Sequence, residues 1–123
     1  MSECGICIGG SGDYESWEFC SYEKPKARKQ HKCYECYRNI SKGDVHEKIS
    51  GKINGDFESY RICLDCVNIR DGLSCGEPIG IGELWENVYY IFNEFNTNCL
   101  AKIKTVSAKE YILERWRKWK GLT

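Results

Sequence analysis

Alternating apolar and polar positions predict a β-hairpin in the middle of the chain. VHEKIS at residues 45–50 and FESYRI at residues 57–62 both have the period of two that is typical of a half-buried strand. Asn54-Gly55 lies between these runs, and this dipeptide favours a type I′ turn because both central positions of that turn need positive φ. Upstream, the aromatic run YESWEFCSY at residues 14–22 predicts one further short strand.

Helical periodicity replaces this alternation in the second half of the chain. The segment CLDCVNIRDG, residues 63–72, predicts a short helix that Gly72 is placed to end. In residues 81–95, apolar side chains recur at the spacing of one helical face. They are Leu84, Val88, Ile91 and Phe95, and the stripe is widened by Trp85, Tyr89 and Phe92.

A last helix is predicted to begin at SAKE, where Ser107 is the N-cap and Glu110 closes a capping box. Its apolar side comprises Tyr111, Ile112, Trp116 and Trp119. We interpret the aromatic residues of both C-terminal helices as core residues. Trp85, Phe92 and Trp116 in particular are expected to be mostly buried.

The cysteine content narrows the chemistry that this chain can perform. Nine of its 123 residues are cysteines, an odd number that is high for one small domain. The N-terminus MSECGICIGGSGD lacks the basic stretch and apolar run of a secretory signal. No apolar run approaches the roughly 20 residues that span a bilayer. We therefore place the chain in a reducing cytoplasm, where clustered cysteines bind metal or do redox work more often than they form disulfides.

Two cysteine pairs flank the predicted hairpin. Cys33-x2-Cys36 and Cys63-x2-Cys66 are separated by 26 residues. Zinc prefers four soft ligands in a tetrahedron, and each C-x2-C turn can supply two thiolates. The second pair opens a predicted helix, whose N-terminus favours negative charge. The order of knuckle, hairpin and helix is that of a treble clef, and it predicts a closed, structural zinc site.

The same residues argue against an enzyme. Four thiolates leave no open position on the metal for water, and neither C-x2-C pair lies in the βαβ context of a thioredoxin-like redox motif. Treble clefs also carry histidine-metal nuclease centres, which need histidines converging on a catalytic ion. Here His46 stands alone, and we expect it to be an exposed strand residue.

The remaining cysteines suggest a second zinc site. Cys4 and Cys7 repeat the knuckle spacing, Cys20 ends the predicted N-terminal strand, and Cys75 follows the first helix. Our preferred grouping is Cys4, Cys7, Cys20 and Cys75, with His31 as the alternative to Cys20. His31 can equally be a histidine that hydrogen-bonds the knuckle backbone. Cys99 is expected to be a buried free thiol.

Together these elements predict an α+β fold in a single domain, residues 1–123. Residues 1–32 would form an N-terminal knuckle and a basic linker, and residues 33–76 the treble-clef-like zinc unit. Residues 77–123 would form two C-terminal helices that cover one side of that unit.

The run from Ala27 to Leu73 resembles a family of small cysteine-rich proteins of bacteriophages and prophages. The shared features are an ARK-x-H-x-C-x2-C opening, an I-x2-G turn, an SG-x3-G hairpin and an R/K-x-C-x2-C helix, followed by LWE at residues 84–86. The resemblance covers residues 26–87. It implies a zinc-binding protein of viral origin in the cytoplasm of an infected bacterium, with Cys33, Cys36, Cys63 and Cys66 as ligands. It implies no activity. Cys20 matches no family position, and the C-terminal helices lie outside the resemblance.

Formal charge balances at 18 basic and 18 acidic residues, but its distribution is uneven. Residues 1–23 carry five acidic side chains and no basic one, whereas KPKARKQHK, residues 24–32, carries five lysines or arginines and no acid. A second basic run, RWRKWK, occupies residues 115–120. Each run is either a solvated face or a contact surface for an acidic partner.

These observations favour a binding protein that docks on a host or viral protein and modulates or inhibits it without chemistry. Inhibition of a defence complex such as CRISPR is one version. The alternative is a nucleic-acid-binding zinc protein, in which the basic runs contact phosphates and the indoles of RWRKWK stack on bases. Zero net charge argues against the alternative. The candidate partner-binding residues are Tyr34, Tyr37, Lys26, Arg28, Lys29, Arg115, Arg117 and Lys118.

Overall fold

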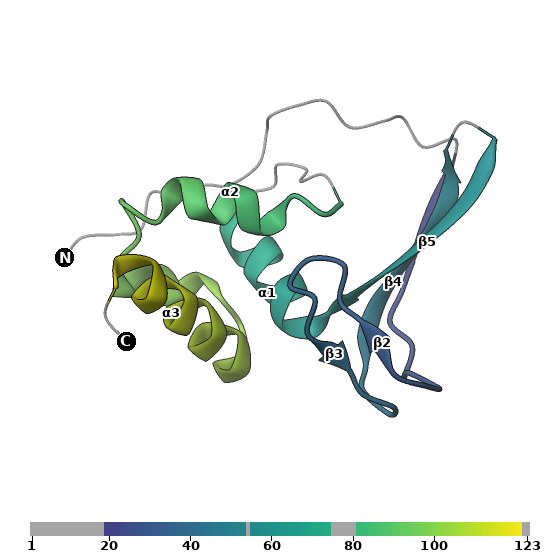
Figure 1. Ribbon diagram of the computed structural model, residues 1–123, viewed down its shortest axis with the longest axis horizontal. Coiled ribbons are helices and arrows are strands. Elements are labelled where there is room, and N and C mark those ends of the chain that lie inside the picture. The colour runs from purple at the N-terminus through teal and green to yellow at the C-terminus, as the bar shows by residue number, and fades with distance from the viewer. Residues whose placement is uncertain (1–18, 54, 75–80, 122–123) are drawn as a thin grey trace.

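A computed structural model describes residues 19–53, 55–74 and 81–121 of this chain. These residues form an α+β fold in which a sheet projects to one side and the helices gather on the other (Figure 1). The strands are β1 (Phe19–Glu23), β2 (His31–Lys32), β3 (Asn39–Ile40), β4 (His46–Ile53) and β5 (Asp56–Cys63). The helices are α1 (Leu64–Leu73), α2 (Leu84–Ile91), the 3-10 helix η1 (Thr97–Lys102) and α3 (Val106–Lys120). In this part of the chain, no helix combines the length and apolar character needed to span a membrane.

The predicted hairpin is present as β4 and β5, which pair antiparallel from His46↔Cys63 to Ile53↔Asp56. Gly55, in the connection, has a φ of 86°, a left-handed conformation that glycine adopts without strain. β1 pairs with the free side of β4 and completes a three-stranded sheet in the order β1-β4-β5. The N-terminal strand predicted within residues 14–22 therefore exists at residues 19–23.

The core lies where the base of this sheet meets the helices. Alternate residues of the hairpin face inward, so that Ile49 and Ile62 are buried. They join buried residues from every helix, namely Val67, Ile69, Leu73, Leu84, Val88, Phe92, Cys99 and Ile112. Trp85 and Phe92 are buried as expected, and Trp116 is half-buried with its indole N–H donating to the carbonyl oxygen of Phe92 at 3.1 Å.

Two features of α3 differ from the sequence prediction. The N-cap is Thr105 instead of Ser107, because the Thr105 hydroxyl accepts a hydrogen bond from the Ala108 amide at 3.2 Å. A helix that starts at Val106 also brings Ala108 and Ile112, four residues apart, into the core together. Trp119 was expected on the apolar side, but it is 48 % exposed, although its ring centre lies 5.7 Å from that of Phe92.

Gly72 does not end α1, which continues to Leu73 with Ser74 as its C-cap. Its role is close packing instead. A Cβ atom at this position would collide with the backbone carbonyl of Lys102 and lie 3.3 Å from the Cα atom of Ile103. Glycine therefore allows α1 to approach the end of η1 backbone to backbone, which a local sequence pattern does not reveal.

Gly72→Ala should destabilise the protein by about 3 kcal/mol, because the obstructing atoms belong to the backbone and cannot rotate away. In a helix without this contact, the same change would stabilise the protein by about 0.5–1 kcal/mol. The sign of the change in unfolding free energy therefore shows whether the contact with Lys102 requires glycine at position 72. Denaturant unfolding of the metal-loaded protein gives the measurement. Gly121→Ala is the matched control. A Cβ atom at Gly121 has no neighbouring atom to collide with, so the only cost of this change is the backbone strain of a φ of 80°. Its loss of stability should be the smaller of the two.

Candidate metal centre

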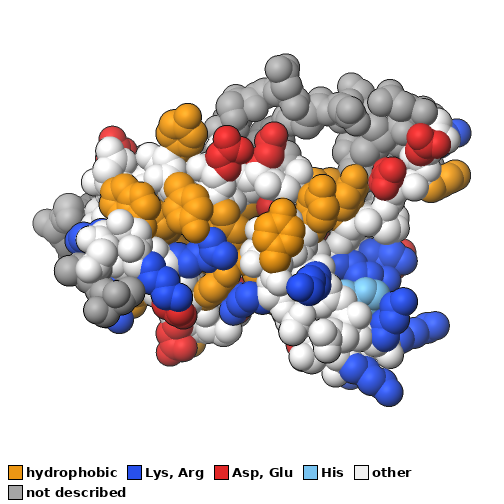
Figure 2. All heavy atoms as spheres, viewed as in Figure 1, with side chains coloured by type: hydrophobic (Ala, Val, Ile, Leu, Met, Phe, Trp, Pro, Cys, Tyr) orange, Lys and Arg blue, Asp and Glu red, His pale blue; other side chains and the backbone are white. Residues whose placement is uncertain are grey.

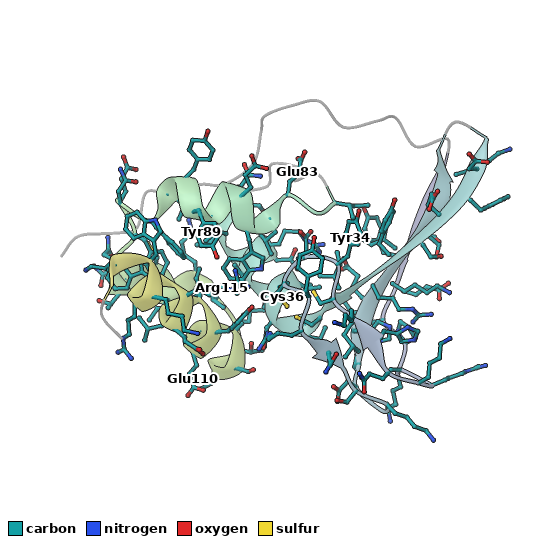
Figure 3. The ribbon with its side chains drawn as sticks, in the orientation of Figure 1. Tyr34, Cys36, Glu83, Tyr89, Glu110 and Arg115 are labelled. Carbon is teal, nitrogen blue, oxygen red and sulfur yellow. The ribbon has the colours of Figure 1, made fainter. Side chains whose placement is uncertain are left out.

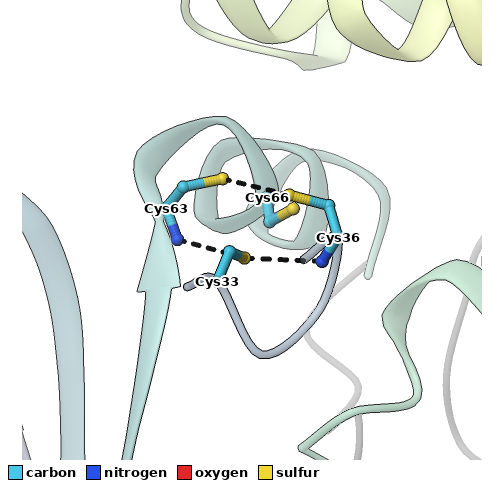
Figure 4. A group of neighbouring side chains, drawn as sticks. All are labelled: Cys33, Cys36, Cys63 and Cys66. Carbon is cyan, nitrogen blue, oxygen red and sulfur yellow. Dashed lines mark hydrogen bonds between the residues drawn. The ribbon is translucent and has the colours of Figure 1, made fainter. Parts of the chain in front are cut away.

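The four cysteines of the two C-x2-C pairs come together at the base of the hairpin. Their sulfur atoms all lie within 4.8 Å of one another, and none of the four is in a disulfide (Figure 4). Cys33 and Cys36 come from the loop between β2 and β3, Cys63 ends β5, and Cys66 lies in the first turn of α1. Cys33 and Cys66 are fully buried. This four-cysteine cluster has a geometry that can hold a metal ion.

The loop of residues 33–36, which we call the knuckle, is shaped by its backbone. Short pairing of β2 with β3 closes the loop, and the Tyr37 amide donates to the Cys33 carbonyl at 2.9 Å. Tyr37 itself has a φ of 62°, which is uncommon for a residue other than glycine. The amides of Glu35, Cys36 and Cys63 point at the Cys33 sulfur from 3.4, 3.5 and 3.3 Å. These dipoles stabilise negative charge on that sulfur.

Four thiols in this small volume cannot all become thiolates without a compensating cation. Hydrogen bonds with Cys33, Cys63 and Cys66 lower the pKa of the Cys36 thiol, since they stabilise its charged form. Hydrogen bonds with Cys33, Cys36 and Cys63, together with burial, raise the pKa of the Cys66 thiol. A bound divalent cation would stabilise the charged form of every thiol in the cluster and would allow all four to lose their protons.

Arg38 supplies positive charge beside the cluster, a role that sequence reasoning missed. Its Nε atom lies 3.4 Å from the Cys36 sulfur, and its Nη2 atom lies 3.7 Å from the Cys63 sulfur. Nη2 also donates to Asp65 Oδ2 at 2.9 Å. The guanidinium carbon sits 3.4 Å above the ring centre of Tyr111 in α3. Arg38 thus connects the cluster to the C-terminal helix.

Two further contacts attach α2 to the cluster. The Trp85 indole N–H donates to the Cys66 sulfur at 3.4 Å, which gives a physical role to the tryptophan of the LWE motif. The buried carboxylate of Glu35 in the knuckle accepts the amides of Gly82 and Leu84 at 3.1 and 3.2 Å. Burial raises the pKa of Glu35 to about 7, although both amides act in the opposite direction. The signal that could have revealed this contact is an acidic residue between two knuckle cysteines.

The second predicted zinc site falls largely outside the described residues. Cys4, Cys7 and Cys75 lie outside them, as does the side chain of Cys20 in β1. His31 is described, and it is not part of the four-cysteine cluster; its ring lies 5.9 Å from that of His46. Desolvation, and then the charges of Arg61 and Lys29, lower the pKa of His31. Cys99 is buried but disulfide-bonded, so the expectation of a free thiol was wrong.

His46 is fully buried, in contrast to the exposed strand residue that was expected. The reason is that the basic segment 24–32 packs across the base of the hairpin instead of linking two units. The amides of His46 and Ala27 donate to the carbonyls of Pro25 and Asp44 at 3.1 and 2.9 Å. Beneath this cover, His46 Nδ1 lies 3.2 Å from the Asp44 carbonyl oxygen, and His46 Nε2 lies 2.7 Å from Arg61 Nη1.

Five of the eight candidate partner-binding residues line two hollows on the surface. Lys26, Arg28 and Lys29 line one hollow with strand residues of the sheet, and we call it the basic cup. Arg115 and Lys118 line the other, the aromatic groove, with Cys36, Arg38, Tyr89, Tyr111, Glu114 and Trp119 (Figure 3). Arg117 is exposed on α3, and Tyr34 and Tyr37 are exposed on and beside the knuckle. The structure therefore separates the two basic runs of the sequence.

Comparisons with known proteins give no match, since no family model, curated protein or solved structure is significantly similar to this chain. The site is interpreted from its own geometry.

Arg38→Gln should weaken metal binding at the cluster by about 10- to 100-fold, because the charge that balances two of the sulfurs is removed. Competition with a chromophoric chelator measures the affinity. Arg117→Gln is the matched control, since it removes the same charge from an exposed position on α3. Equal affinities of the two variants would mean that Arg38 does not stabilise the thiolates.

Proposed function

We propose that this chain is a zinc-stabilised binding protein that docks on another protein and modulates or inhibits it without chemistry. One observation carries the proposal. Three of the four cysteines are buried and Cys63 is partly buried, and together they offer four thiols, a donor set that closes the coordination of a metal. What this region presents to solvent is therefore a set of aromatic and cationic side chains, which is typical of a contact surface.

Zinc is the metal that the donor set favours. Soft thiolates select zinc, copper(I) or iron–sulfur clusters, and four thiolates in a tetrahedron are typical of structural zinc sites. The order of knuckle, β4–β5 hairpin and α1, with one cysteine pair in the knuckle and the other at the start of the helix, supports assignment as a treble-clef-like unit. In that unit zinc would stabilise the fold, and no step of a reaction would pass through it.

The aromatic groove is the proposed docking surface. Arg115 is fixed there by Tyr111 and Tyr89, whose hydroxyls accept its Nε–H and Nη1–H at 2.9 and 2.6 Å. Its guanidinium carbon lies 4.1 Å from the ring centre of Trp85. Ordered arginine and aromatic side chains are the residues that carry most binding energy in protein interfaces. On this face hydrophobic side chains form a broken band with Lys and Arg between them (Figure 2).

Tyr37 extends this surface beside the knuckle. Tyr37 is 67 % exposed, and its backbone is left-handed. Tyr34, in contrast, packs on Tyr60 with ring centres 4.6 Å apart, which leaves it 42 % exposed at the border. Arg115, Arg117 and Lys118 would steer an acidic partner toward these rings.

The resemblance to small cysteine-rich phage proteins supports a host or viral protein as the partner, in the cytoplasm of a bacterium. A defence complex such as CRISPR is one such target. The disulfide of Cys99 is unusual for a reducing compartment, and its full burial separates it from dissolved thiols. A nucleic acid is a less favourable partner for α3, because Trp116 is half-buried and Lys120 Nζ lies 4.2 Å from its ring centre, which leaves Trp119 as the exposed indole of this run for stacking on a base.

Freshly purified protein should contain at least one zinc ion per chain. A second ion at Cys4, Cys7, Cys20 and Cys75 would require all four to be thiols, and hence the disulfide of Cys99 to be reduced. Metal analysis measures the content, and less than about half an equivalent would reject the zinc proposal. About one equivalent would keep the four-cysteine site and reject the second.

Cys36→Ser should unfold the unit of residues 33–76, because structural zinc supplies about 10 kcal/mol or more to small metal-dependent folds. Circular dichroism and amide NMR spectra of the variant should match those of wild-type protein treated with a strong chelator. A folded, zinc-free Cys36→Ser protein would contradict the structural role of the metal.

Tyr37→Asn should reduce capture of the protein partner by about tenfold, because it removes an exposed ring from the proposed surface. Asparagine tolerates the left-handed backbone at this position, so folding is kept. The assay is quantitative affinity capture from infected bacterial lysate with the full chain. Tyr90→Asn, at an 80 % exposed tyrosine on α2 outside the groove, is the matched control and should capture normally. Equal losses of capture in both variants would contradict the proposal that Tyr37 belongs to the docking surface.

A further inference from the structure

The basic cup is a second concave surface, built on the sheet rather than on the helices. Its volume is about 580 Å³. Cationic and histidine side chains line it, contributed by the packed basic segment, β2, β4 and β5; they are Lys26, Arg28, Lys29, His31, Lys48 and Arg61. Figure 2 shows Lys and Arg side chains gathered around a histidine at this end of the molecule. Among the described residues that line the cup, Glu23 is the one carboxylate.

The strand register concentrates positive charge in the floor of the cup. Lys48 of β4 and Arg61 of β5 are direct partners across the hairpin. Like charges directly opposite each other destabilise a sheet. Glu23, opposite Lys48 on β1, offsets one of the five cations. The remaining positive charge does not contribute to folding, and an anionic ligand would reduce the repulsion between these cations.

Arg61 is held in place before any ligand binds. It is half-buried, and its Nη1 atom lies 2.7 Å from Nε2 of the buried His46. In the part of the chain that the structure describes, Arg38 and Arg70 pair with Asp65 and Glu47, whereas no carboxylate lies within 4.0 Å of Arg61. A partly desolvated guanidinium without a counter-charge has donors to offer to an anion.

We propose that the basic cup binds a compact oligophosphate anion. A terminal phosphate group carries a charge of about −1.5 to −2 near pH 7 and three acceptor oxygens, and each bridging group adds one further charge, so an anion of about three linked phosphates balances the excess cations in this volume. Matching the same charge with carboxylates would require several acidic side chains in one small cup. Arginine also forms bidentate hydrogen bonds with phosphate, and the fixed Arg61 is oriented for such a contact.

Phosphate groups, and not nucleobases, would be recognised. The cup has no aromatic side chain other than the imidazole of His31 among its lining residues, so it offers little surface for base stacking. A free nucleoside polyphosphate, inorganic polyphosphate and the backbone of a nucleic acid share the required chemistry. The cup shares no lining residue with the aromatic groove, so this proposal and the proposed function can fail independently.

Isothermal titration calorimetry of the full-length, zinc-loaded protein with sodium tripolyphosphate at about 50 mM salt tests the proposal. Arg61→Ala and the double variant Arg28→Ala/Lys29→Ala should each weaken binding by about tenfold or more. The double variant changes exposed side chains only, so it stays informative if loss of Arg61 disturbs His46. Lys42→Ala/Lys104→Ala removes two charges from exposed positions outside the cup and should bind as wild type.

Two further titrants identify the source of the phosphate. Binding of tripolyphosphate that both cup variants weaken supports a free polyphosphate ligand. Binding of a DNA duplex of about 20 base pairs, weakened by the same variants, with no response to tripolyphosphate, would overturn a compact anion as the ligand in favour of the backbone of a nucleic acid. A penta-glutamate peptide that binds as tightly as either would overturn phosphate recognition. Absence of binding to all three, or equal losses in the cup and control variants, would also overturn it.

Discussion

Four thiols within 4.8 Å of one another set the constraint on which the rest of this structure depends. Their negative charge cannot develop fully in a buried space unless donors and a cation share it. The surrounding residues meet this need in part. Backbone amides of the knuckle point at the Cys33 sulfur, Arg38 lies beside Cys36 and Cys63, and the Trp85 indole donates to Cys66. The proposed zinc ion would supply the remaining positive charge.

The same donors join the two halves of the chain. Trp85 belongs to α2, and Arg38 stacks on Tyr111 of α3, so stabilisation of the sulfurs also positions the C-terminal helices. Glu35 adds a third connection through the amides that precede and begin α2. Because Cys36 and Arg38 also line the aromatic groove, the shape of the proposed docking surface depends on the cluster. A structural metal can in this way define a binding surface without contacting the partner.

Zero net charge conceals two surfaces of different character. In the aromatic groove the cations are ordered by tyrosine hydroxyls and indole faces, which suits a partner with apolar as well as acidic groups. In the basic cup the cations line a volume without aromatic rings other than an imidazole, which suits a small, highly charged anion. The net charge of the chain predicts neither surface, because both depend on which side chains the fold brings together.

The sequence by itself determined the hairpin, the two cysteine pairs and the burial of Trp85 and Phe92, because turn chemistry, ligand spacing and helical period are local properties. Only the tertiary structure decided the burial of His46, the packing role of Gly72 and the cap at Thr105. It also decided the exposure of Trp119 and the contacts of Glu35, Arg38 and Arg61. Apart from the cap at Thr105, which a hydrogen bond from the nearby Ala108 amide makes, these features depend on segments far away in the sequence, such as residues 24–32 across the hairpin or Lys102 against α1. A local pattern shows which residues can face the core, whereas close approach between distant segments decides which of them do.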